Sequence, residues 1–186
     1  MQGLAAQKAP SPVNGARPLE AVLRRGGGVA GVLVTYATEH RPTRAVAVAL
    51  ADTLREQGLQ ADVEAACATR DLTPYDVVIL GAPLCRGRWH QDAVRFLKTH
   101  CEALANRDVA IFALGQRTPI GQSGRTRWRE QLDGALYRSP WLNPVSVALF
   151  DDVDSPTRKG SRRNQRDRRA IRDWALGIAE HALASG

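Results

Sequence analysis

Apolar strand-like runs alternate with amphipathic helical segments along most of this chain, and this alternation restricts the fold more than any other feature. Val29 to Ala37 and Asp76 to Ala82 are continuous apolar runs with β-branched residues, the pattern of strands buried on both faces. Between them, Thr43 to Gln57 places its apolar residues on one helical face, and Gly58 is expected to end that helix. The other strands are expected at Leu59 to Ala65, Val109 to Leu114 and Val145 to Phe150, and the other helices at about Trp89 to Ala105, at Arg125 to Leu136 and after the arginine-rich segment that ends near Arg172.

Five strands that alternate with helices predict an α/β fold, in which a parallel sheet carries helices on both faces. A closed eight-stranded barrel needs about 250 residues, more than the 186 of this chain, so the sheet is expected to be open. Right-handed crossovers then favour a doubly wound sheet with strand order 2-1-3-4-5. Ligands of such sheets bind at the carboxyl ends of the strands, where loops 37–43, 82–90 and 114–124 are expected to meet.

Composition assigns the chain to the ordinary globular proteins, with 44% hydrophobic and 24% charged residues. Residues 1–28 carry loop signals such as Asn14-Gly15 and Gly26 to Gly28, so we expect a flexible N-terminal tail followed by one domain at residues 29–186. No apolar run approaches the roughly 20 residues of a membrane span. Three cysteines do not make a disulfide framework, and with no signal-peptide pattern we expect a cytoplasmic protein.

The positive charge is concentrated near the C-terminus. Residues 155–173 hold eight basic side chains against Asp167 and Asp173, a net charge of +6, while the whole chain carries +7. An arginine run of this kind either contacts an anionic partner or forms a solvated loop that keeps the protein soluble. The basic residues are Arg158, Lys159, Arg162, Arg163, Arg166, Arg168, Arg169 and Arg172.

Two stretches resemble the flavodoxin family, and within it the flavodoxin-domain proteins similar to menaquinone-dependent protoporphyrinogen oxidase. The first is Val32 to Thr38 (VLVTYAT) together with Thr43 and Arg44, and the second is Leu80 to His90 (LGAPLCRGRWH). The resemblance covers roughly Val29 to Leu183. It implies a flavodoxin-like doubly wound sheet that binds flavin mononucleotide (FMN).

The resemblance also implies which residues hold the cofactor. The first loop would bind the phosphate through hydroxyl groups and through backbone N–H groups at a helix N-terminus, and the second and third loops would flank the isoalloxazine ring. Trp89 would stack on that ring or cap the following helix. The implied cofactor residues are Thr38, Glu39, His40, Arg41, Pro42 and Thr43 in the first loop, Ala82, Pro83, Leu84, Cys85, Arg86, Gly87 and Trp89 in the second, and Leu114, Gly115 and Gln116 in the third.

The first loop departs from the family pattern at three positions. Arg41 stands where the family has a glycine, Pro42 removes one N–H donor, and Ala37 replaces a hydroxyl. Arg41 either contacts the phosphate directly through its guanidinium or blocks the cavity. The loop therefore leaves three alternatives open: a working FMN site, a degenerate site in a retained fold, or a site for another anion.

The sequence leaves the catalytic residues unassigned. Cys85 lies beside Arg86 and Arg88, which would favour its thiolate, and His40 and His90 lie in adjacent loops from which a histidine can move a proton. These three are weak candidates, and their spacing gives no metal motif.

Taken together with the residues, the resemblance implies an FMN-binding oxidoreductase that acts on a quinone or porphyrinogen-type substrate or another acidic small molecule. A cationic rim of Arg41, Arg44, Arg86, Arg88 and Arg117 would favour acidic substrates and anionic reduced flavin. The alternative is a flavin-free module that binds an anionic partner through its arginine run at residues 158–172. The sequence does not indicate an oligomeric state.

Overall fold

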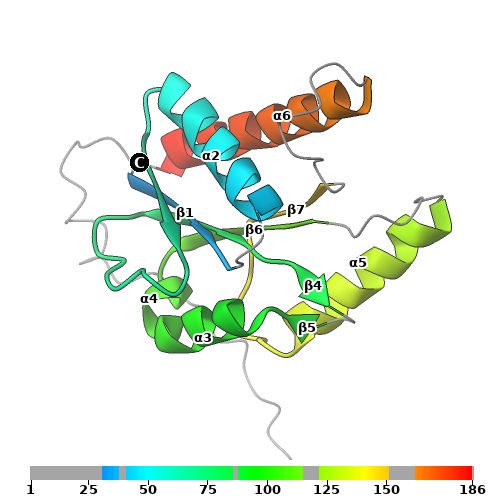
Figure 1. Ribbon diagram of the computed structural model, residues 1–186. Coiled ribbons are helices and arrows are strands. Elements are labelled where there is room, and N and C mark those ends of the chain that lie inside the picture. Colours follow the sequence, from blue (N-terminus) through cyan, green and yellow to red (C-terminus); the bar gives the residue numbers. More distant parts are fainter. Residues whose placement is uncertain (1–30, 38–40, 86–87, 115–121, 151–161, 186) are drawn as a thin grey trace, which may run out of the picture.

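The computed structural model describes residues 31–37, 41–85, 88–114, 122–150 and 162–185 of the chain. Its main sheet contains five parallel strands in the order β2-β1-β3-β6-β7 (Figure 1). Because β6 and β7 are the fourth and fifth strands of this sheet, the predicted order 2-1-3-4-5 is confirmed. The strands are β1 (Gly31–Tyr36), β2 (Gln60–Ala65), β3 (Val77–Gly81), β6 (Asp108–Leu114) and β7 (Ser146–Phe150).

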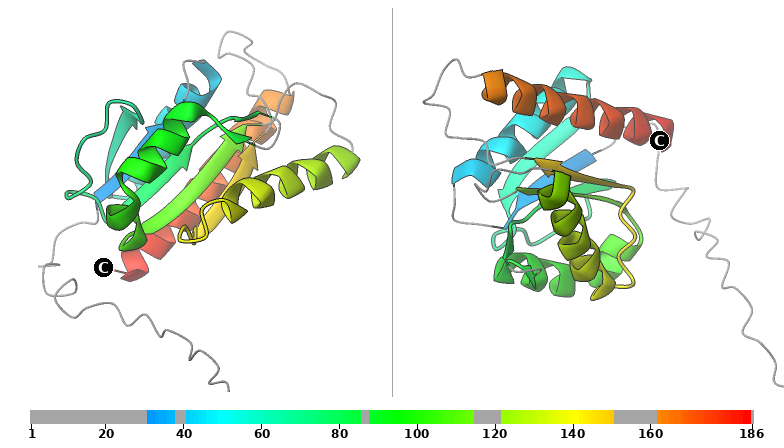
Figure 2. Two further views of the ribbon diagram at one scale, coloured as in Figure 1. Left: turned by 90° about the horizontal axis from the view of Figure 1, so that it is seen from below. Right: turned by 90° about the vertical axis from the view of Figure 1, so that its right-hand side faces the viewer.

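Helices cover the sheet on both faces, as the apolar runs predict. On one face lie α2 (Arg41–Glu56) and α6 (Arg162–Ser185), and on the other lie α3 (Gln91–Thr99), α4 (Cys101–Ala105) and α5 (Gln122–Tyr137) (Figures 1 and 2). Alternate residues of β1 divide between the two cores: Val32 and Val34 pack with α2 and α6, whereas Leu33 packs with the α3 and α5 side. Burial on both faces explains why the strand contains almost no polar residue.

Helix α2 ends where the sequence predicts. Gly58 adopts φ +84°, a conformation that glycine reaches without the strain a Cβ atom would impose. Its N–H bonds the Arg55 carbonyl at 2.9 Å, and the Leu59 N–H bonds the Leu54 carbonyl at 3.2 Å. The chain can therefore turn directly into β2, which lies at the sheet edge.

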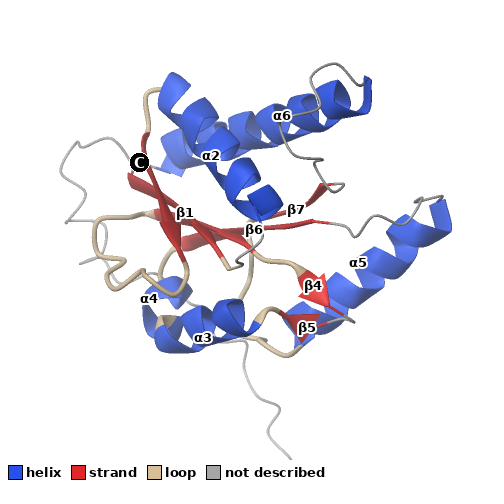
Figure 3. Ribbon diagram, viewed as in Figure 1, coloured by secondary structure: helices blue, strands red, loops and turns tan. Residues whose placement is uncertain are grey.

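The predicted helix from Trp89 to Ala105 is wrong at its start and in its middle. Trp89 lies in β5 (Arg88–Trp89), which pairs antiparallel with β4 (Leu84–Cys85) in a separate two-stranded sheet (Figure 3). Helix α3 begins only at Gln91, because the imidazole of His90 accepts the Asp92 N–H and caps it. At His100 the helix stops and α4 starts. Apolar periodicity persists through both interruptions and so does not reveal them.

The prediction that the last helix follows the arginine run is also wrong. Helix α6 begins at Arg162, so six of the eight basic residues are helical, while Arg158 and Lys159 lie outside the described residues. Arginine is a good helix former, and neither glycine nor proline interrupts residues 162–176. Neither α6 nor any other helix of the described part is long and apolar enough to cross a membrane.

Three aromatic side chains connect α6 to the sheet. The ring of Trp174 meets Phe112 at a centroid distance of 6.3 Å and Phe150 at 5.7 Å, both edge-on. Its Nε1 donates to Ser146 Oγ at 2.8 Å. Gly81 on β3 makes room for this cluster, since a Cβ atom there would collide with the ring of Phe112.

We expect Gly81→Ala to lower the free energy of unfolding by about 1–3 kcal/mol, because the added methyl group overpacks a fully buried region. Gly134→Ala is the matched control: a Cβ atom there meets nothing within 4 Å, and the change should stabilise helix α5 by up to about 1 kcal/mol. Urea unfolding of both variants measures the difference. An unchanged midpoint for Gly81→Ala would contradict this packing.

A second expectation concerns Thr35, which is fully buried on β1. Its hydroxyl has no hydrogen-bond partner within the described part of the chain. A buried hydroxyl without a partner is unfavourable, so Thr35→Val should raise the free energy of unfolding by about 1 kcal/mol. The control is Thr53→Val, because the buried Thr53 hydroxyl donates to the Ala49 carbonyl at 3.0 Å and should not gain in the same way. Thermal melts of both variants test this, and destabilisation by Thr35→Val would show that the hydroxyl has a partner after all.

Candidate cofactor site at the carboxyl edge of the sheet

The parallel register brings the predicted loops to one edge of the sheet. Tyr36 on β1 lies beside Gly81 on β3, and Gly81 lies beside Phe112 on β6. Hydrogen bonds extend this alignment into the loops: the Ala37 N–H bonds the Gly81 carbonyl at 2.8 Å, and the Ala82 N–H bonds the Phe112 carbonyl at 3.1 Å. The first and second loops therefore leave the sheet side by side, with the end of β6 next to them.

The N-terminus of α2 lies at this edge, directly after the first loop. The first turn of α2 contains Arg41 and Thr43 but no acidic residue. Thr43 is 2% exposed, whereas Arg44 is exposed. At a helix start the N–H groups have no partner within the helix and the helix dipole is positive, which favours an anion. Pro42 contributes no N–H, so Arg41, Thr43 and Arg44 supply the helical donors.

This donor set fits a phosphate group. Backbone N–H groups, a threonine hydroxyl and flanking arginines are the chemistry that binds phosphate at a helix N-terminus. Thr38, Glu39 and His40 lie outside the described residues, as does the side chain of Arg41.

The second loop forms a short hairpin that the sequence analysis missed. Leu84 pairs with Trp89 across β4 and β5, and the His90 N–H bonds the Pro83 carbonyl at 3.2 Å. Ala82 and Leu84 are buried and Pro83 is partly buried. Only Arg86 and Gly87 connect the two strands, and both lie outside the described residues, as does the Cys85 side chain. A two-residue connection containing glycine is a hairpin signal that could have been recognised.

The indole of Trp89 belongs to the core on the α3 and α5 side. Its side chain packs there and is 9% exposed, which leaves little of its surface for stacking. The alternative role expected for it, capping the helix, falls to His90. The indole Nε1 is buried and has no hydrogen-bond partner among the described residues.

The third loop is described only at its start. Leu114 ends β6 and is 7% exposed, so it borders the same edge as Ala37 and Ala82. Gly115, Gln116 and Arg117 lie outside the described residues.

Of the weak catalytic candidates, the structure places only His90 in detail. Its Nδ1 accepts the Asp92 N–H at 3.3 Å and lies 3.6 Å from Asp92 Oδ2, so this nitrogen serves the start of α3. The sequence analysis did not foresee the pair between His181 and Asp108, whose Nε2 and Oδ2 lie 3.1 Å apart. Because Asp108 begins β6, that pair lies at the amino edge of the sheet, away from the loops. In the part of the chain that the structure describes, no three metal-binding side chains gather.

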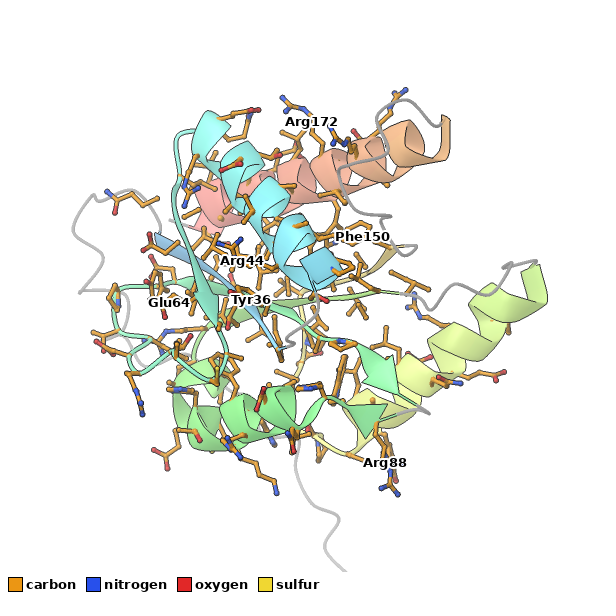
Figure 4. The ribbon with its side chains drawn as sticks, viewed as in Figure 1. Tyr36, Arg44, Glu64, Arg88, Phe150 and Arg172 are labelled. Carbon is orange, nitrogen blue, oxygen red and sulfur yellow. The ribbon has the colours of Figure 1, made fainter. Side chains whose placement is uncertain are left out.

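Of the arginines expected to form one cationic rim, the two whose side chains the structure describes lie apart. Arg44 belongs to α2 on one side of the sheet, and Arg88 projects from β5 on the other side (Figure 4). The side chains of Arg41, Arg86 and Arg117 lie outside the described residues. Among the described side chains, positive charge is therefore available on two sides of the second loop.

Comparison with known proteins agrees with this geometry. Residues 33–151 match the family described as "Flavodoxin domain". The chain is 34% identical to protoporphyrinogen IX dehydrogenase (quinone) of Escherichia coli strain K12 over 141 residues, which cover 63% of this chain and 77% of that protein.

Solved structures show the same fold at lower identity. Oxidised flavodoxin 1 from Bacillus cereus superposes with a TM-score of 0.56 at 16% identity, covering 82% of this chain and 99% of that one. A flavodoxin from the domain Archaea gives a TM-score of 0.55 at 15% identity, with 82% and 99% coverage.

Proposed function

This chain belongs to the flavodoxin domain family, and on that premise we propose that it is an oxidoreductase that binds FMN at the carboxyl edge of its sheet. The observation that carries the proposal is the α2 N-terminus, whose first turn lacks acidic residues and contains the buried Thr43 beside the ends of β1 and β3. The bound flavin would supply the chemistry, since it accepts and donates two electrons together with protons.

The first loop and the start of α2 would hold the FMN phosphate. Thr38 and Thr43 would contribute hydroxyl groups, and the helix start would contribute N–H donors and its dipole. Pro42 withholds one of these donors. We propose that the Arg41 guanidinium, which forms charge-assisted bonds to phosphate, compensates for that loss.

The isoalloxazine ring would lie between the second and third loops. The hairpin of β4 and β5 holds the second loop to the sheet, because the Ala82 and His90 N–H groups are both bonded to backbone carbonyls. A loop fixed in this way can position a flat ring and exclude water from one of its faces. On this proposal Ala82 to Gly87, with Leu114 to Gln116, form the ring site, while Trp89, expected to stack on the ring, supports the hairpin from the core instead.

The substrate proposed is a quinone, a porphyrinogen or another acidic small molecule. The name of the E. coli relative supports this class, since that protein is a protoporphyrinogen IX dehydrogenase of the quinone type. The formal net charge of +7 also favours anionic substrates. Proton movement during turnover would fall to Cys85, His40 or the Nε2 nitrogen of His90.

A second candidate function rests on α6. Arg168 and Arg169 are exposed on this helix, and a basic helix can bind an anionic partner. However, Arg172, labelled in Figure 4, already pairs with Glu56 at 2.7 Å, and Arg169 lies 3.7 Å from Asp173. Part of the positive charge of α6 is therefore already paired with carboxylates of this chain. A colourless protein that melts at the same temperature with and without FMN would favour this candidate.

We expect the purified protein to be yellow, with flavin absorbance near 450 nm, or to become so when FMN is added. FMN at a hundred times its dissociation constant should add about 2.7 kcal/mol to the free energy of unfolding. An absorbance scan and thermal melts with and without FMN measure this. If the protein shows no flavin colour and no melting shift at saturating FMN, the cofactor site is ruled out.

Arg41→Gln should weaken FMN binding by about tenfold to a hundredfold, the effect of one lost charge-assisted hydrogen bond. Riboflavin, which lacks the phosphate, should bind this variant and the natural protein equally well. Arg95→Gln is the control, because Arg95 is an exposed residue of α3. Fluorescence titration measures both ligands. An equal loss for FMN and riboflavin would show that Arg41 shapes the cavity and does not bind phosphate.

A further inference from the structure

A cleft of about 670 Å³ lies on the α3 and α5 side of the molecule, apart from the α2 N-terminus. Its walls come from β5, from α3, and from the end of α5 with the segment that follows. This volume is within the range of small-molecule sites, roughly 300–1,000 Å³. Arg88 and Trp89 of β5 form one wall, so the cleft adjoins the hairpin of the proposed ring site.

The lining of the cleft combines apolar rings with positive charge. Trp89 and Trp141 lie in its walls together with Val94 and Leu97. Basic side chains come from Arg88, Lys98 and Arg138, and among the described lining residues none is acidic. Such a lining suits a ligand with a flat apolar body and anionic groups at its edge.

Two exposed aromatic side chains also single out this region. Trp141 is 39% exposed and nearby Tyr137 is 86% exposed, and large exposed aromatic side chains near a cleft are typical of binding surfaces.

The cations at the opening are available for a ligand. Arg88 and Lys98 are both exposed, and within the described residues neither forms an ion pair. Figure 4 shows Arg88 extending away from the sheet below β5. Lys98 belongs to the last turn of α3, so the two positive charges stand at separate points of the cleft.

We propose that this cleft binds the acidic, ring-bodied substrate, with its apolar body between Trp89 and Trp141 and its carboxylates on Arg88 and Lys98. The proposal rests on the proposed function for the identity of the substrate class, and it assigns to that class a place beside the flavin loop. On this proposal the two kinds of anionic group bind at different places. The FMN phosphate binds at the α2 N-terminus, and the substrate carboxylates bind in the cleft.

The test uses protoporphyrin IX, a flat dicarboxylate, and its uncharged dimethyl ester as probes for the full chain as purified. Binding is followed by quenching of tryptophan fluorescence and by the porphyrin absorbance. We expect the dicarboxylate to bind at least about tenfold more tightly than the ester, the effect of about 1.4 kcal/mol of charge recognition. Equal binding of both probes, or no binding, would overturn the proposal.

Variants locate the site. The double variant Arg88→Gln with Lys98→Gln should weaken dicarboxylate binding about tenfold or more and leave ester binding unchanged. Trp141→Ala should weaken both probes, because it removes apolar contact. Arg95→Gln, which removes one positive charge from α3 outside the cleft lining, should change neither. If Arg95→Gln weakened binding as much as the double variant, only the overall charge would matter and the cleft would be excluded.

FMN content and FMN melting shifts of the same variants separate this proposal from the proposed function. Arg88→Gln with Lys98→Gln should leave the phosphate site at α2 intact. Charge-dependent porphyrin binding by a protein that never binds FMN would support the cleft and refute the cofactor site. FMN binding without charge-dependent porphyrin binding would support the cofactor site and refute the cleft.

Discussion

The parallel pairing of β1 with β3 is the constraint on which the rest of the structure depends. Both strands are buried on both faces, and their register brings Tyr36 beside Gly81. The Ala37 N–H continues the pairing beyond the strands by bonding the Gly81 carbonyl. Because the connections from β1 run to α2 and from β3 to α3, on opposite faces, the two following loops must diverge at this point. The divergence leaves room at the sheet edge, where doubly wound folds bind their ligands.

The two faces of the sheet contribute different parts of the proposed sites. The face of α2 and α6 contributes a helix N-terminus without acidic residues and the aromatic cluster around Phe112. The face of α3 and α5 contributes a cleft with basic and aromatic walls. At the end of β3, the ring of Phe112 fills the space that a side chain of residue 81 would need, so only glycine fits there. Core packing and loop position are therefore linked at this residue.

Sequence reasoning succeeds where a pattern has one physical solution. Continuous apolar runs such as Val77 to Gly81 must be buried on both faces, which predicts the α/β class, and right-handed crossovers then favour the sheet order that is observed. It fails where two local structures suit the same residues. Trp89 fits the apolar stripe of a helix as well as a hairpin strand. It lies in the hairpin because His90 caps α3, so the helix begins only after His90. Arginines 162–172 suit a solvated loop or a helix, and packing of Ile171 and Ala175 against the α2 side favours the helix. The predicted first-loop residues Thr38 to His40 lie outside the described residues, so their role stays a prediction.

The hairpin of β4 and β5 connects the two proposed sites mechanically. Leu84 faces Trp89 across the hairpin, and Trp89 is at once a member of the core and a wall of the cleft. A ligand that contacts Trp89 in the cleft would therefore also act on β5, the strand that leads out of the flavin loop. Such coupling is reciprocal, because two ligands that bias one element change each other's affinity by the same factor. If FMN and the acidic substrate occupy opposite sides of this hairpin, each should bind more tightly or more weakly in the presence of the other by one common factor. Two sites without a shared element would show no such dependence, and the hairpin is the described element that both sites share.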